Sequence, residues 1–146
     1  MRLLDANIFL RALVVPESEA DHVRAQAAAA LFERLGKGEE EATTIEAIIT
    51  EVCYVLRSRA HYALSPAEVA ARLRPLLMLR GLKLPHKRTY LQALDLWVAF
   101  PTLDFEDVLL LAHAERLGLD AITSYDTDFD HLPGIARTQP ESVELP

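Results

Sequence analysis

Short apolar segments alternate with longer segments of helical periodicity along this 146-residue chain, and this alternation restricts its possible folds more than any other feature. The strand-like segments are residues 2–5, 42–44, 82–84, 121–124 and 135–137. The helical segments are residues 16–35, 45–59, 65–75, 86–100 and 104–118, with a further apolar helical turn after Asn7. Strands that alternate with helices predict an α/β fold, here a three-layer α/β/α sandwich around a mostly parallel central sheet.

Two helix starts have the spacing of a capping box, in which a hydroxyl side chain and a glutamate each bond to the other residue's backbone. Thr43 and Glu46 have this spacing before the second long helix, and Ser65 and Glu68 have it before the third. Pro75 is expected to kink or end that third helix, because proline lacks the backbone N–H that a helix interior uses.

Composition and size are those of an ordinary globular domain. The apolar fraction is 51% and the charged fraction 25%, so we expect one domain over residues 1–146. The single cysteine, Cys53, cannot form an intramolecular disulfide, which suits a reducing compartment. No apolar run reaches the roughly 18 residues of a membrane span. We therefore expect a soluble, cytoplasmic protein without a membrane partner.

The net charge of −7 argues against indiscriminate coating of nucleic acid, but it hides an asymmetry. Eight of the fifteen basic residues lie between Arg57 and Arg88, with Glu68 as the single acidic residue among them. The segment is either an ordinary solvated helix face or a local phosphate-binding surface on an otherwise acidic molecule.

Glu51 is the most informative acidic residue. Its neighbours at helical spacing are Ala47, Ile48, Tyr54 and Val55. This environment predicts a carboxylate on or beside the buried stripe of its helix, where it needs a cation or a proton. The alternative is a buried ion pair.

Other carboxylates follow strands or begin helices. Asp5 and Asp126 lie at the carboxyl ends of expected strands, where ligands bind in parallel sheets, and Asp128 follows Asp126 at a spacing that allows both to point the same way. Taken singly, Asp5 fits a helix cap and Asp126 an ordinary turn. Asp107 has leucines at helical spacing, but it also fits a bond back to an Asp104 cap.

Convergence of these carboxylates would require a counter-charge. A like-charged pair at about 5 Å costs roughly 3 kcal/mol at an effective dielectric near 20. A hard divalent cation such as Mg²⁺ takes oxygen ligands and keeps several waters, whereas the scattered histidines and Cys53 have no zinc-like spacing. An all-oxygen site that retains water suits phosphodiester hydrolysis.

Four short motifs occur in order along nearly the whole chain, from Leu3 to about Arg137. They are Asp5-x-Asn7, Glu51-Val-x-Tyr-Val-Leu, Asp104-Phe-x-Asp107-x-Leu and Ser124-x-Asp126-x-Asp128-Phe. Each motif alone is weak, but the ordered set resembles the PIN domain. The length of the chain resembles most the VapC-type toxins of toxin–antitoxin pairs.

The resemblance implies an endoribonuclease that depends on Mg²⁺ or Mn²⁺, forms a homodimer, and is inhibited by a cognate antitoxin whose C-terminal segment crosses the active site. It implies catalytic and metal-binding roles for Asp5, Glu51, Asp107 and Asp126. It implies auxiliary roles for Asn7, Ser124 and Asp128. The candidate RNA contacts from the basic segment are Arg57, Arg59, Arg72, Arg74 and Arg80. The sequence departs from the family pattern at Ala6 and Ser124, where threonine is frequent.

Other functions compete with this hypothesis. A catalytically silent PIN-like module would bind RNA or a protein partner, and a PIN nuclease of RNA maturation would act without an antitoxin. A phosphoacceptor domain also gathers carboxylates at strand ends, but it needs a lysine just after a strand-end Ser or Thr. Lys37, Lys83 and Lys87 do not have that position, and Asn7 stands where the phosphatase type has a second aspartate.

Overall fold

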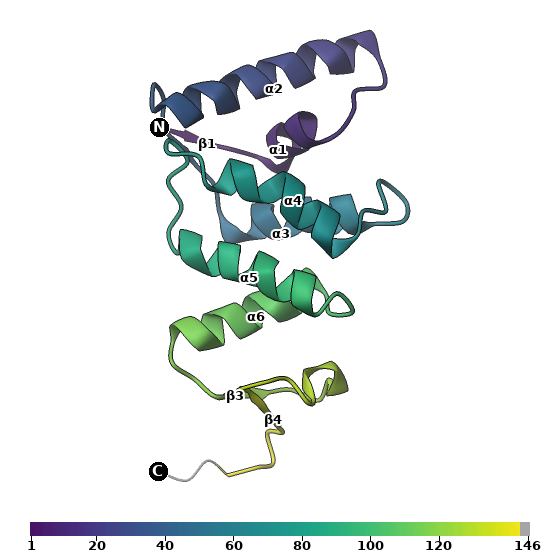
Figure 1. Cartoon of the computed structure of the whole chain (residues 1–146), viewed down its shortest axis with the longest axis vertical. Helices are drawn as coiled ribbons and strands as arrows, with labels where there is room; N and C mark the ends of the chain where they lie inside the picture. Colours follow the sequence, from purple (N-terminus) through teal and green to yellow (C-terminus); the bar gives the residue numbers. More distant parts are fainter. Residues whose placement is uncertain (144–146) are drawn as a thin grey trace.

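Six α-helices and four strands of two or three residues alternate within residues 1–143, the part of the chain that the computed structural model describes (Figure 1). In chain order they are β1 (Arg2–Leu3), α1 (Ala6–Leu13), α2 (Glu19–Lys37), β2 (Ala42–Thr43), α3 (Glu46–Arg57), α4 (Pro66–Leu77), α5 (Lys87–Ala99), α6 (Phe105–Arg116), β3 (Ala121–Thr123), the 3-10 turn η1 (Thr127–Phe129) and β4 (Ala136–Thr138).

All of the observed strand pairs are parallel. β1 pairs with β2, in the register that places Arg2 opposite Ala42. The third expected strand is reduced to a single parallel bridge between Leu82 and Ala42. β3 pairs with β4, with Ala121 opposite Ala136. Parallel strands connected by helices confirm the predicted α/β fold class.

The strands do not form one continuous sheet in residues 1–143, because β1–β2 and β3–β4 are separate two-stranded sheets. Figure 1 shows β1 near one end of an elongated molecule and β3–β4 near the other, with α3 to α6 between them. The alternation of strands and helices in the sequence had predicted a single central sheet. The reason for the difference is the position of α6, which packs on α5 and α3 and carries β3 on its far side.

The helix starts show one confirmed cap and one wrong prediction. Ser65 caps α4, because its Oγ accepts a hydrogen bond from the Glu68 backbone N–H at 3.2 Å. The box predicted at Thr43 is wrong: α3 starts after Ile45, which offers no side-chain cap, and the Glu46 carboxylate lies 2.8 Å from His113 Nε2 instead. α4 continues through Pro75 and ends two residues later.

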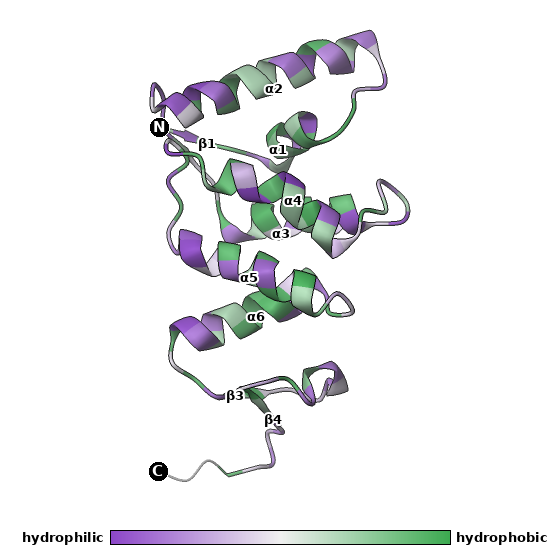
Figure 2. Ribbon diagram, in the orientation of Figure 1, coloured by the Kyte–Doolittle hydropathy of each residue, from purple (hydrophilic) through white to green (hydrophobic). Residues whose placement is uncertain are grey.

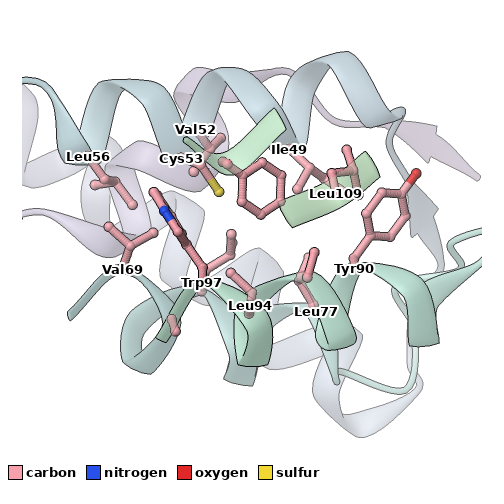
Figure 3. Close-up of a cluster of buried hydrophobic side chains, with 14 of the residues drawn as sticks. Ile49, Val52, Cys53, Leu56, Val69, Leu77, Tyr90, Leu94, Trp97 and Leu109 are labelled. Atoms are coloured by element: carbon pink, nitrogen blue, oxygen red, sulfur yellow. The ribbon is translucent and has the colours of Figure 1, made fainter. Parts of the chain in front are cut away.

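The core lies mainly between the helices, and Leu4, Ala42, Leu82 and Ile122 join it from the strand regions. Figure 3 shows Cys53 and Leu56 of α3 pointing toward Leu94 and Trp97 of α5. The Trp97 ring packs edge-on against Phe105 with ring centres 5.4 Å apart, and its Nε1–H donates to a buried backbone carbonyl at 2.8 Å. Figure 2 shows apolar and polar residues alternating along these helices, as amphipathic packing requires. This core fixes α6, and α6 in turn positions the candidate site.

Candidate metal centre

Three carboxylates meet where α6 begins and β3 ends. Oxygens of Asp107, Asp126 and Asp128 lie within 4.8 Å of one another. We call these three residues the acidic cluster. Asp107 is in the first turn of α6, Asp126 is the N-cap of η1, and Asp128 belongs to η1 itself. Two segments about twenty residues apart in the sequence therefore supply the cluster.

The turn after β3 is organised by its own side chains. Asp126 Oδ1 accepts from the Asp128 backbone N–H at 2.8 Å. The Ser124 Oγ accepts from the Asp126 backbone N–H at 3.0 Å. These two bonds fold the segment so that both carboxylates face α6, which is the orientation that a shared cation needs.

Asp107 is held by the start of its helix. Its Oδ2 accepts from the Asp104 backbone N–H at 3.4 Å, so the bond back to the cap that the sequence allowed is present, although it is long. The positive end of the helix dipole favours a carboxylate at this position. The bond orients Asp107 and leaves its other oxygen available to the cluster.

The ionised form of Asp107 is disfavoured by its surroundings in the cluster. Burial raises the pKa of Asp107, and the neighbouring carboxylates of Asp104, Asp126 and Asp128 raise it further, against the lowering effect of the Asp104 N–H bond. A raised carboxyl pKa means that the environment of the residue disfavours its ionised form. A divalent cation would reverse that effect, and three carboxylates are the hard oxygen donors that Mg²⁺ and Mn²⁺ prefer. The donor set therefore fits the expected metal.

The structure places Asp5, Asn7 and Glu51 outside the acidic cluster. Asp5 is the N-cap of α1 without a side-chain cap bond, and Asn7 is on α1; both are exposed. Glu51 is exposed on α3, so the prediction that it lies beside the buried stripe is wrong, and so is the alternative of a buried ion pair. The core-facing side of α3 is formed by other residues, among them Val52 and Cys53.

A model of the PIN domain family matches residues 2–135, nearly the whole chain. The chain belongs to the PIN domain family. PIN domains are generally nucleases that need a metal, and PIN nucleases act on RNA. A comparison with curated proteins found no match. Among the described helices of this PIN domain, none has the length and apolar character to cross a membrane.

The arginines of the basic segment differ in their surroundings. Arg57 and Arg59 line a cavity of about 380 Å³ with Asp104 and Glu106, at the same end of α6 as Asp107. The other three candidates lie elsewhere. Arg72 donates to the Leu13 carbonyl at 3.0 Å, Arg74 pairs with Asp95, and Arg80 is exposed.

Arg137, on strand β4, is a cation beside the acidic cluster that was not predicted from the sequence. Its guanidinium donates to Asp130 at 2.7 Å and to the Ser124 carbonyl at 3.2 Å, and the charge of Asp126 helps raise its pKa. The parallel register sets Arg137 opposite Ile122, and that pairing could not be read from the sequence. Arg137 therefore supports the turn mainly through Asp130 and interacts with Asp126 only through its charge.

Proposed function

We propose that this PIN domain is an endoribonuclease that depends on Mg²⁺ or Mn²⁺ and serves as the toxin of a type II toxin–antitoxin pair. The observation that carries the nuclease proposal is the acidic cluster of Asp107, Asp126 and Asp128, in which burial and the neighbouring carboxylates raise the pKa of Asp107. The four ordered sequence motifs and the match over residues 2–135 support it.

In this proposal the metal ligands are Asp107 and Asp126, joined by Asp5 and Glu51 when the site is complete. When bound, a divalent cation supplies a water of lowered pKa and stabilises charge during displacement at phosphorus. Asp128 adds an auxiliary carboxylate, and the Ser124 hydroxyl holds the turn that presents Asp126. Asn7, the second residue of α1, would contact the RNA backbone or an ion-bound water by its amide.

Arg57 and Arg59 are the best placed of the basic residues to hold RNA. They line a cavity next to the first turn of α6, which also carries Asp107. Phosphate contacts position a nucleic acid without reading its sequence. These two arginines would therefore hold the backbone beside the scissile phosphate, while Arg72 and Arg74 are engaged within the fold.

The proposed protein partner is an antitoxin with a cationic side chain. An acidic cluster that binds a metal cation also attracts the side chain of Arg or Lys. A charge-assisted hydrogen bond from that side chain would block binding of both the metal and the RNA. An antitoxin-tail peptide should bind, and the same peptide with its basic residue changed to Glu should bind far more weakly. Equal binding of the two peptides would place the inhibitory contact elsewhere.

The nuclease proposal is tested with purified protein and labelled RNA. We expect cleavage in Mg²⁺ or Mn²⁺, loss of cleavage in excess EDTA, and products with 5′-phosphate and 3′-hydroxyl ends. Asp120→Asn is the matched control for aspartate substitutions in the acidic cluster, because Asp120 is an exposed aspartate outside it. Cleavage that persists in EDTA, or a 2′,3′-cyclic phosphate product, would overturn the metal-dependent mechanism.

A second candidate function is a silent module that binds RNA or a protein. It is favoured by the separation of Asp5 and Glu51 from the acidic cluster in the single chain. RNA binding without any cleavage, in both metals and over a range of protein concentrations, would support this alternative.

A further inference from the structure

A cavity lies between α3 and the first turn of α6, and the proposed cleavage uses only its two arginines. Its volume is about 380 Å³, within the roughly 300–1,000 Å³ that is usual for small-ligand sites. We call it the Tyr54 cavity. The residues of its lining that carry a charge or an aromatic ring for the ligand are Tyr54, Arg57, Arg59, Trp97, Asp104 and Glu106.

The two walls of the Tyr54 cavity carry opposite charge. Arg57 and Arg59 lie at the end of α3 and just after it, whereas Asp104 and Glu106 lie at the start of α6. Within residues 1–143 these four groups form no ion pair with one another. Opposite charges that share a cavity without pairing suit a ligand with an anionic group at one end and hydrogen-bond donors at the other.

Glu106 faces this cavity, whereas the next residue, Asp107, faces the acidic cluster. Consecutive helix residues project about 100° apart, which separates the two directions. The pKa of the Cys53 thiol in the cavity lining is raised by burial and further by the charge of Glu106. The pKa of Asp107 is raised by burial and by the carboxylates of Asp104 and the cluster instead. The Glu106 carboxylate therefore acts across the cavity toward α3.

Tyr54 gives the cavity an exposed aromatic ring. Its side chain lines the cavity from α3 and is 67% exposed. The floor is buried: Figure 3 shows Cys53 of α3 pointing toward Trp97 of α5, and both residues line the cavity. An exposed ring beside a buried floor suits a flat aromatic ligand, because unpaired bases of single-stranded RNA stack on aromatic side chains.

We propose that the Tyr54 cavity binds a guanine base of the substrate RNA, which stacks on Tyr54 and donates hydrogen bonds from its Watson–Crick edge to the Glu106 carboxylate. The proposal rests on the proposed nuclease function. Arg57 and Arg59, on the opposite wall, then hold a phosphate of the same strand. Because the Cα atoms of Glu106 and Asp107 are only about 3.8 Å apart, the bound guanosine lies next to the phosphate at the acidic cluster.

The chemistry of a carboxylate selects this base. An ionised carboxylate accepts hydrogen bonds and donates none. Guanine has two adjacent donors on its Watson–Crick edge, N1–H and N2–H, and both can bond to one carboxylate. Adenine and cytosine have a ring nitrogen with a lone pair beside their amino group, and uracil has N3–H between two carbonyls. Each of these three bases would set a lone pair against the Glu106 carboxylate, so the site rejects them.

The first experiment measures binding of the four nucleoside 5′-monophosphates by calorimetry, in Mg²⁺ and in EDTA. These probes have no internucleotide bond, so binding is measured without cleavage. We expect the wild type to prefer GMP by about tenfold, the scale of one bidentate contact. Glu106→Gln should lose that preference and gain affinity for AMP and CMP, because an amide offers both an acceptor and a donor. Glu115→Gln, which changes an exposed glutamate at the other end of α6, is the matched control and should keep the preference for GMP.

The second experiment tests the stacking. Tyr54→Ala should weaken binding of all four nucleotides by about tenfold and keep their order, because stacking on an aromatic ring tolerates every base. Tyr54→Phe keeps the ring and should bind as the wild type does. Trp97 is the single tryptophan of the chain and lines the cavity, so its fluorescence should change when GMP binds. Unchanged GMP affinity in Tyr54→Ala would overturn the proposed site.

Cleavage of labelled RNA separates this proposal from the nuclease function. The wild type should cut next to guanosine, and Glu106→Gln should move the cuts toward adenosine and cytidine. A GMP preference that disappears in Glu106→Gln, in a protein that cuts no RNA, would support the guanine site and overturn the nuclease function. Cleavage without any preference for guanosine, or a GMP preference that survives in Glu106→Gln, would overturn the guanine site and leave the nuclease function standing.

Discussion

The two sheets of this protein differ in how they are anchored. In the first, Leu4 directly after β1 is 4% exposed, and Ala42 of β2 and Leu82 at the bridge are fully buried, although the two residues of β1 itself are exposed. In the second, Ile122 and Phe129 are the residues that bury an apolar side chain, and polar contacts such as Asp130–Arg137 hold the remainder. Residues of both sheet regions belong to the same core cluster, but the second region buries fewer of them and depends more on polar contacts.

This difference bears on function because the acidic cluster belongs to the second sheet and α6, while Asp5 and Glu51 belong to the first half. Regions with few buried apolar contacts open with low free energy while the rest of a protein stays folded. We therefore expect the half that carries the acidic cluster to move against a more rigid half that carries Asp5 and Glu51.

The largest expected effect comes from the acidic cluster itself. Asp107→Asn removes a ligand charge, so cleavage should fall at least about a hundredfold. The pKa of Asp107 is raised in the folded state, so its ionisation disfavours folding as the pH rises through that pKa. The metal-free variant should therefore be as stable as the wild type or more so at neutral pH, by urea denaturation. A variant that unfolds without metal would show that Asp107 is structural.

Truncating one buried side chain in each sheet region tests whether the two regions differ in stability. Leu4→Ala should lower the free energy of unfolding by roughly 2–4 kcal/mol, because it leaves a cavity in the main core. Ile122→Ala should lower the global value less, but it should speed hydrogen exchange across residues 120–138. Equal global losses and equal exchange in the two variants would show that the halves unfold as one unit.

Acid should loosen the second sheet before the first. The hydrogen bond from Arg137 lowers the pKa of Asp130, so this pair stabilises the fold above the ordinary carboxyl pKa of 3.8, and the contribution is lost as the pH falls through the lowered value. Hydrogen exchange at β4 should rise below about pH 4 while β1 and β2 stay protected. In the Asp130→Asn variant, the protection of β4 against exchange should be the same above and below about pH 4.

The smallest effect concerns RNA affinity at the border between the halves. Arg57→Glu or Arg59→Glu should weaken RNA binding and reduce the salt slope by roughly 0.7 for a single strand. Arg74→Glu is the matched control, since Arg74 pairs with Asp95. Turnover at saturating RNA should barely change. Unchanged RNA affinity in both test variants would show that the basic segment is an ordinary solvated helix face.

Local signals in the sequence predicted the elements well. Periodicity located the long helices to within a few residues, and the Ser65–Glu68 cap forms because it depends only on its own turn. Glu51 was misjudged because helical spacing names a residue's neighbours without telling which face of α3 meets the core. The division of the sheet was beyond reach for a similar reason, since it depends on how α5 and α6 pack.

The paired strands of this protein are only two or three residues long. Each pairing adds only a few backbone hydrogen bonds, of about 0.5–1.5 kcal/mol net apiece, so the helices set the position of the strands more than the strand pairs do. The spacing of the three carboxylates therefore depends on how α6 packs against α5, and a substitution in that packing would change the acidic cluster without touching it.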